Sequence, residues 1–255
     1  MQSIISEKLS IQRDQDILKE MDQFVDWNMS AHPLSNLVNI ARGGAFVARD
    51  HDTNIGMVYA FPYDHIGWIG FLIVNPAYRK RGIGTTLMTK AIDFLHQKGI
   101  NSIGLYATED GAPLYQKLGF TKVLTSWRYG INETTELENL KNSLKSYFNP
   151  SSFEVTEFSQ IDHELFENIV NLDTKTFGAN RRLIFENRLR MGSWQCTCIL
   201  NGATLEAFGM WRLIDNHFGF IGPIVGLKLP VFQVLLPKII LQSLSAKVKD
   251  EKDQP

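Results

Sequence analysis

The sequence predicts an α/β protein (α+β in some schemes) with a mixed central sheet flanked by helices. Three observations support this fold class. Strand-like and helix-like patterns alternate over residues 3–130. Two strand-like runs are joined by a turn signal at residues 51–54, which predicts a hairpin. The run at 67–74 is apolar on both faces, as expected of a central strand.

The expected elements follow in order along the first half of the chain. They are a strand at 3–11, a helix at 14–29, hairpin strands at 44–50 and 55–64, the central strand at 67–74, a helix that ends at Gly99, a strand at 102–108, a short helix at 111–118 and a last strand at 120–130. The helices are predicted from apolar residues at helical spacing, such as Leu87, Met88, Ala91 and Leu95.

Bulk composition narrows the class of protein. The chain has 255 residues and a formal net charge of -1, so it can bury one large core or two medium ones and has no basic excess for nucleic acid. We expect a cytoplasmic protein without membrane contact, because no apolar run is long enough to span a bilayer and the first residues do not resemble a signal peptide. Cys196 and Cys198 are expected on one face of a strand as buried thiols, with no metal site.

A second set of elements begins after Gly130. Residues 131–152 predict a linker helix and turn, and residues 153–255 a second domain. The segments "HIGWIG" at 65–70 and "HFGFIG" at 217–222 share His, Gly, Ile and Gly at matching places, and their flanking patterns agree. We infer a first domain at 1–130 and a second domain of the same ancestry.

The segment "NPAYRKRGIGTT" at 75–86 predicts an anion site. It follows the central strand and opens a helix, so turn amides and the first amides of the helix converge on one point. Gly82 and Gly84 allow torsions and close approach that a Cβ would obstruct, and Arg79, Lys80 and Arg81 add positive charge. The alternative is a tight turn whose cations are merely solvated.

The pattern Arg79-x-x-Gly82-x-Gly84 resembles the R/Q-x-x-G-x-G/A motif of the GCN5-related N-acetyltransferases, the GNAT family. The span "FLIVNPAYRKRGIGTTLMTKAIDFL" is similar to that family's acetyl-CoA motif, and "APLYQKLGF" at 112–120 to its closing helix and strand. The resemblance covers about residues 3–130. It implies the GNAT fold, with a mostly antiparallel sheet that splays apart, and acetyl-CoA as cosubstrate.

The resemblance also implies which residues bind the cosubstrate. The backbone of Leu72, Ile73 and Val74 would pair with the pantetheine arm, and amides from Lys80, Arg81, Gly82, Ile83, Gly84 and Thr85 would hold the pyrophosphate with Arg79. Thr108 stands where the family often has a pantetheine-binding Asn, and Lys80 where it often has Gly. We therefore expect retained binding with altered affinity.

Tyr115 stands where the family commonly keeps a tyrosine facing the CoA sulfur. A phenol with a reference pKa of ~10 keeps its proton at neutral pH, so it can donate that proton to a leaving thiolate. The alternative is an aromatic core residue. Asp64, His65, Glu109 and Asp110 are possible bases, but each also fits a turn or cap, so no base is assigned.

The second half has its own resemblance. The stretch "NLDTKTFGANRRLIFENRL" at 171–189, followed by "GFIGPIVG", is similar to the C-terminal domain of a subgroup of bacterial acetyltransferases with tandem related domains; Asp173, Phe177, Gly178 and Arg181 carry the match. This domain either supplies a wall of the acceptor site or only supports the fold. It lacks the paired glycines, and it is expected to be incomplete at its end, which would favour a shortened chain or a homo-oligomer.

These observations predict an acetyl-CoA-dependent N-acetyltransferase that acts on a primary amine, with a small molecule as the expected acceptor and Tyr115 as general acid. Two alternatives remain open: a protein lysine or N-terminal acetyltransferase, and a non-catalytic acyl-CoA sensor. Release of free CoA thiol with a panel of amines distinguishes them.

Overall fold

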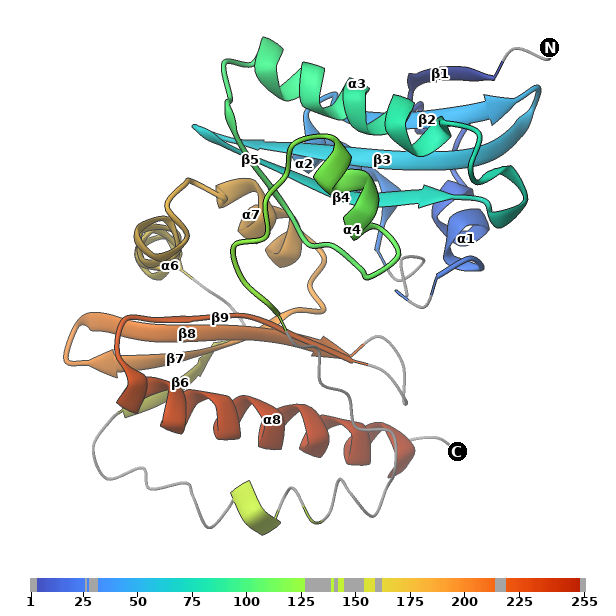
Figure 1. The fold of residues 1–255 in the computed structure, drawn as a ribbon. Helices are drawn as coiled ribbons and strands as arrows, with labels where there is room; N and C mark the ends of the chain where they lie inside the picture. The colour runs from blue at the N-terminus through green and yellow to red at the C-terminus, as the bar shows by residue number, and fades with distance from the viewer. Residues whose placement is uncertain are drawn as a thin grey trace. The chain divides into compact units, whose positions relative to one another are not determined.

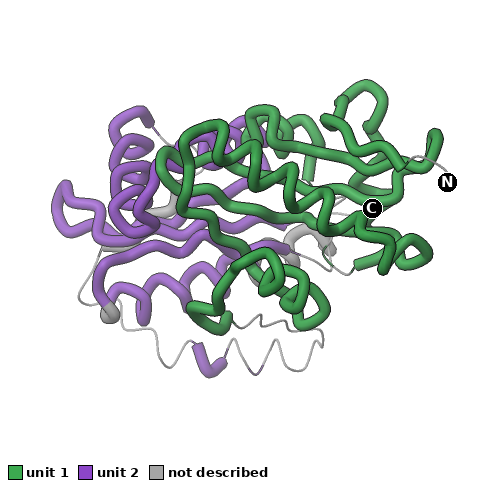
Figure 2. The backbone as a smooth tube through the Cα atoms, turned by 45° about the horizontal axis from the view of Figure 1, so that its top comes forward, with its two compact units in different colours: residues 1–127 green, residues 128–255 purple. Residues whose placement is uncertain are grey.

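The computed structural model describes residues 4–25, 27, 32–126, 139, 142–144, 154–158, 162–213 and 219–252. Two compact units divide the chain, residues 1–127 and 128–255 (Figure 2). Most of the expected linker at 131–152 lies outside the described residues, which are helical there at 139 and 142–144.

The first unit is a five-stranded mixed sheet with helices on its faces (Figure 1). Its elements are β1 (Ile5–Lys8), α1 (Ile17–Asp22), α2 (Leu34–Ala41), β2 (Ala45–Asp50), β3 (Thr53–Tyr63), β4 (Ile66–Val74), the 3₁₀ helix η2 (Pro76–Tyr78), α3 (Ile83–Gln97), β5 (Ser102–Leu105) and α4 (Ala112–Lys117). The strands are ordered β1-β2-β3-β4-β5. All neighbours are antiparallel except β4 and β5, which are parallel. The predicted fold class is confirmed.

Helix α3 covers one face of this sheet. Its buried residues Leu87, Met88, Ala91 and Leu95 form one apolar cluster with strand residues that include Val58. The opposite face of β3 is contacted by α1 and α2. Alternation along β3 therefore sends successive side chains to two separate layers, as burial on both faces of a central strand requires.

Several helices and strands of the first unit differ from the sequence prediction. The helix predicted at 14–29 is only α1, and the sequence interpretation missed α2, whose Leu34, Leu37 and Ala41 are buried at helical spacing. The strands predicted at 3–11 and 102–108 shorten to β1 and β5. Residues 121–126 form no strand, and 127–130 lie outside the described residues. Val123 is 89% exposed, so this segment has no sheet face to cover.

The second unit is a four-stranded antiparallel sheet with helices on both faces (Figure 1). Its elements are β6 (Glu154–Phe158), α6 (His163–Phe177), α7 (Arg182–Arg190), β7 (Gln195–Asn201), β8 (Thr204–Leu213), β9 (Gly219–Gly226) and α8 (Leu229–Lys252). Alternate residues of β7 and β8 enter two clusters: Cys198 and Phe208 pack with α6 and α7, while Ile199 and Ala207 pack with α8. Cys196 and Cys198 share one face as expected, with sulfur atoms 3.8 Å apart.

The two sheets share their irregularities as well as their strand pattern. In the first unit Val58 lies opposite both Phe71 and Leu72, because the register shifts between Met57/Ile73 and Tyr59/Gly70. In the second, Met210 lies opposite Gly222 and Pro223 by the same kind of shift. Each is a β-bulge in the third antiparallel strand pair. The hairpins β2–β3 and β7–β8 also carry a register shift at matching places.

Residues that carried the second resemblance lie together at the junction of α6 and α7. The guanidinium of Arg181 binds the buried carboxylate of Asp173 through two hydrogen bonds of 2.6 and 3.0 Å. The same guanidinium lies 3.9 Å from the ring centroid of Phe177. Gly178 ends α6 with φ 91°, a conformation that favours glycine. These contacts give all four residues a structural role. Of the echo at 217–222, residues 217 and 218 lie outside the described residues.

Candidate functional site

The parallel pairing of β4 with β5 stops halfway along β4. The last paired residues are Ile69 and Leu105, so the rest of β4 has a strand partner only on the β3 side, where Ile73 and Val74 pair with Met57 and Gly56. An unpaired strand edge exposes N–H and C=O groups that an extended ligand can bind. The predicted pantetheine residues Leu72, Ile73 and Val74 lie on this open stretch.

The loop between β4 and α3 presents a row of backbone donors. The amides of Lys80, Arg81, Gly82, Ile83, Gly84 and Thr85 donate to no acceptor within the described residues, whereas Arg79 and Thr86 on either side donate to Pro76 and Gly82. Lys80 has φ 62° and Gly82 has φ 80°, so the chain turns sharply twice within the loop. Alternating left-handed residues of this kind form an anion-binding concavity that continues into the first turn of a helix.

The arginine side chains brace this loop. Arg79 Nε donates to the carbonyl of Val74 at 3.2 Å, and Arg81 donates to the carbonyl of Ala77 at 3.3 Å while its guanidinium lies 5.0 Å from the Tyr78 ring centroid. Tyr78 in turn donates a hydrogen bond to Asp50, which raises the pKa of the Tyr78 hydroxyl. The loop is therefore pinned at the end of β4 and to β2, and its amides hold their positions.

The two glycines of the motif have different structural reasons. A Cβ at Gly82 would meet no atom within 4 Å, so glycine is needed there for its positive φ. A Cβ at Gly84 would lie 3.3 Å from Leu114 Cδ2 and 3.8 Å from Val74 Cγ2. Gly84 thus lets α3 approach α4 and β4. From the sequence, both glycines are expected to allow unusual torsions and close approach. In the structure, Gly82 provides the positive φ and Gly84 provides the close approach.

Tyr115 lies on α4, packed against the cluster beneath α3. Its ring lies beside Gly111, where a Cβ would be 3.0 Å from Tyr115 Cε2, and at 6.2 Å between centroids from Phe120. Burial raises the pKa of the Tyr115 hydroxyl, so this group keeps its proton at neutral pH. In the described part of the chain that hydroxyl has no hydrogen-bond partner.

Thr108 caps the start of α4. Its hydroxyl accepts a hydrogen bond from the amide of Gly111 at 3.2 Å, and its carbonyl accepts from Gly111 and Ala112. Of the possible bases, Asp64 and His65 form the turn between β3 and β4, and Glu109 and Asp110 are exposed in the turn before α4. The described residues contain no group of three or more His, Cys, Asp or Glu side chains that could hold a metal.

Sequence interpretation missed Phe71, which lies at the bulge of β4 with φ 55°. A bulky aromatic residue rarely adopts this conformation, so the sequence carries no signal for it.

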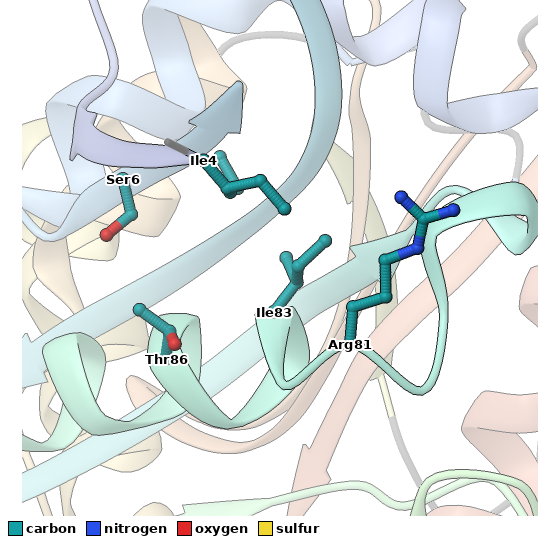
Figure 3. Close-up of a pocket in the computed structure, with 6 residues that line it drawn as sticks. Ile4, Ser6, Arg81, Ile83 and Thr86 are labelled. Carbon is teal, nitrogen blue, oxygen red and sulfur yellow. The ribbon is translucent and has the colours of Figure 1, made fainter. Parts of the chain in front are cut away.

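A separate hollow of about 100 Å³ lies between β1, β2 and the start of α3 (Figure 3). Its described lining includes no residue of β4, β5 or α4, so it is distinct from the open edge and from Tyr115.

Comparison with known proteins matches this geometry to a family. Residues 12–120 match the model of the Acetyltransferase (GNAT) family. The first unit has the GNAT fold. The open edge of β4, the loop amides and Tyr115 all lie within the matched span.

Relatives extend the similarity in different ways. The "Uncharacterized N-acetyltransferase YitH" of Bacillus subtilis is 25% identical over 67% of this chain and 55% of its own length. A mycothiol acetyltransferase of Renibacterium salmoninarum is 33% identical over 32% of this chain and 26% of its own. The chain thus spans about half of one relative and a quarter of the other. A crystal structure from Pyrococcus horikoshii has 22% identity and a TM-score of 0.72, and the match covers 95% of this chain and 78% of that one; it shows that the fold extends over both units.

None of the helices that the structure describes has both the length and the apolarity of a membrane span.

Proposed function

We propose that the chain is an acetyl-CoA-dependent N-acetyltransferase that acts on a primary amine of a small molecule. The observation that carries the proposal is a row of six consecutive amides at the start of α3, from Lys80 to Thr85, that donate to no acceptor within the described residues. A pyrophosphate offers several anionic oxygens to such a row. The residues present fit this group, because Gly82 places no side chain in the loop, and the side chains of Arg79 and Arg81 hold the loop in position.

Acetyl-CoA supplies an acetyl group activated as a thioester. The backbone of Leu72, Ile73 and Val74 is suited to hold the pantetheine arm as an added strand, since β5 leaves that edge open. The amine nitrogen forms the new bond to the acetyl carbon and loses one proton to solvent, the carbon–sulfur bond breaks, and the departing sulfur takes the proton of Tyr115, which regains a proton from solvent. The raised pKa of Tyr115 keeps that proton available at neutral pH.

A small molecule is favoured as the acceptor over a protein because nothing in the composition indicates a charged binding surface. The mycothiol acetyltransferase named above has a small molecule in its name, and its match covers only 32% of this chain. We further propose that residues 153–255 are a second GNAT-like domain, because both sheets repeat the same bulge and hairpin irregularities, with 131–152 as the linker.

The first test pairs Tyr115→Phe with Tyr106→Phe, a matched loss of a hydroxyl from an exposed tyrosine. We expect Tyr115→Phe to lower kcat about 100-fold or more, as removal of a general acid does, with the acetyl-CoA Kd from calorimetry unchanged. Tyr106→Phe should keep the acetyl-CoA Kd. Equal turnover of the Tyr115→Phe and unmodified proteins would refute the acid role. The absence of any heat with acetyl-CoA or CoA would refute the function itself.

A further inference from the structure

Aromatic side chains surround Gly70 on the sheet face turned away from α3. By register, Tyr59 pairs with Gly70, and Phe61 with Trp68. Trp68 leans over β5, where a Cβ at Gly104 would lie 2.7 Å from Trp68 Cζ3, and its ring centroid lies 5.1 Å from that of Tyr106. We name Phe61, Trp68, Phe71 and Tyr106 the Gly70 cluster.

The position above Gly70 itself is open. Apart from its two chain neighbours, the one described residue within 4 Å of a Cβ built there is Phe61, whose Cε2 lies at 3.7 Å. Gly70 does not need a positive φ, so its backbone does not require glycine. What glycine provides here is space among large rings, which suits the approach of a ligand.

Phe71 is held in the cluster at a conformational cost. Its positive φ is strained for a bulky residue, and the bulge turns its ring edge-on to Tyr59 and Phe61, with centroids 5.6 and 6.3 Å away. Strain of this kind persists where surrounding structure enforces it, and it points to a functional position. The bulge sets an aromatic ring beside the open position.

The cluster lies where the cosubstrate edge begins. Gly70 directly follows Ile69, the last β4 residue paired with β5. Exposure rises across the face toward this opening, from Phe61 at 6% to Tyr106 at 69%. A molecule lying on these rings would therefore be next to the stretch of β4 that we assign to the pantetheine arm.

We propose that the Gly70 cluster binds the acceptor, and that the acceptor is a primary ammonium carried on an apolar or aromatic body. This inference rests on the proposed function and names the substrate class of that site. Ring faces carry negative potential, which attracts an ammonium and repels an anion. In the described part of the chain no basic side chain lies over the rings of Phe71 or Tyr106, so these two rings are available to a cation from a ligand.

The test compares phenethylamine, which is an ammonium on an aromatic body, with glucosamine 6-phosphate, which carries an anion. The variants are Gly70→Val, which fills the open position, and Phe71→Gly, which removes a ring where glycine tolerates the backbone. Gly70→Ala fills the same position less, because one methyl group reaches only van der Waals contact. CoA release gives kcat and KM, calorimetry gives the acetyl-CoA Kd, and melting temperatures confirm folding.

We expect a higher kcat/KM for phenethylamine than for glucosamine 6-phosphate. Gly70→Val and Phe71→Gly should each raise the phenethylamine KM about tenfold, while the acetyl-CoA Kd stays within twofold. Gly70→Ala should raise the phenethylamine KM less than Gly70→Val does. Preference for glucosamine 6-phosphate, an unchanged KM in both variants, or acetyl-CoA binding without acetylation of phenethylamine would each overturn the inference.

Saturation-transfer NMR with phenethylamine alone separates this inference from the proposed function. Binding to the unmodified protein that is lost in Gly70→Val supports the cluster as an amine site even if acetyl-CoA does not bind. Binding retained in Gly70→Val overturns the cluster even if acetyl-CoA binds as proposed.

Discussion

At the scale of single residues, Tyr59 shows how strongly the face away from α3 is excluded from water. The residue is fully buried, and its hydroxyl has no hydrogen-bond partner among the described residues. Burial is the main cause that raises the pKa of Tyr59, and the negative charge of Asp14 adds to it. Asp14 is itself buried and paired with Arg49.

The raised pKa of Tyr59 makes stability depend on alkaline pH. The unfolded chain has a tyrosine pKa of ~10, and the folded value is higher. Below pH ~10 the titration of this group does not change the free energy of unfolding. As pH rises from there through the folded pKa, the fold loses stability, because the unfolded chain gives up this proton first.

We predict that Tyr59→Phe raises stability at pH 8 by about 1 kcal/mol, because it removes a buried hydroxyl without a partner. It should also reduce the loss of melting temperature between pH 8 and pH 10.5. Tyr106→Phe, which removes an exposed hydroxyl, should change neither. A Tyr59→Phe protein that melts several degrees lower at pH 8 would show that the hydroxyl stabilises the fold.

At the scale of elements, the start of α3 depends on two glycines for separate reasons, and three substitutions distinguish these reasons. Gly82→Ala should destabilise the protein by about 1 kcal/mol through its positive φ and weaken acetyl-CoA binding. Gly82→Asn should cost less, since Asn tolerates this conformation. Gly84→Val should instead push α4 away through Leu114 and lower kcat through Tyr115.

Calorimetry, melting and CoA release measure these three effects. If Gly84→Val weakened acetyl-CoA binding and left kcat intact, the assignment of Gly84 to helix packing would be wrong. If Gly82→Asn and Gly82→Ala behaved alike, the backbone argument for Gly82 would fail.

Elements with local signals were predictable from the sequence. The β2–β3 hairpin, β4 and α3 were found because turn residues and apolar periodicity lie within a few residues of each other. The strand predicted at 120–130 is absent from the described residues 120–126, since a strand also needs a partner edge that local alternation does not reveal. Helix α2 had a usable signal in Pro33 followed by apolar residues at helical spacing, but the helix predicted before it was drawn too long.

The site was predictable only as far as its motif reached. The positions of Gly82 and Tyr115 followed from the motif, whereas the contact of Gly84 with Leu114 joins residues far apart in the chain. The bulge at Phe71 could not be predicted, because phenylalanine has no preference for the conformation that it adopts there. The open position above Gly70 depends on three strands together.

At the scale of the whole molecule, the proposed cosubstrate residues all lie in the first unit. In the second unit, β9 is followed by Leu227 and Lys228 and then directly by α8. That junction has no glycine pair like Gly82 and Gly84, so it lacks the type of turn that leaves successive amides without acceptors in the described loop between β4 and α3.

We predict that acetyl-CoA slows amide hydrogen exchange at residues 72–74 and 80–85 and leaves residues 219–230 unchanged. Exchange measured by mass spectrometry with and without acetyl-CoA checks this, and Gly82→Ala provides the control with weakened binding. Protection confined to 219–230 would move the cosubstrate site to the second unit.

The uncapped start of α3 also bears on how the reaction ends. Among the residues that the structure describes, no side chain caps this helix, in contrast to α6, where Asp162 accepts from the amide of Leu165. The loop amides that would bind the diphosphate do not contact the acetyl group, so they should bind free CoA as tightly as acetyl-CoA. Turnover should then slow as free CoA accumulates, and the enzyme would respond to the ratio of the two forms in its surroundings.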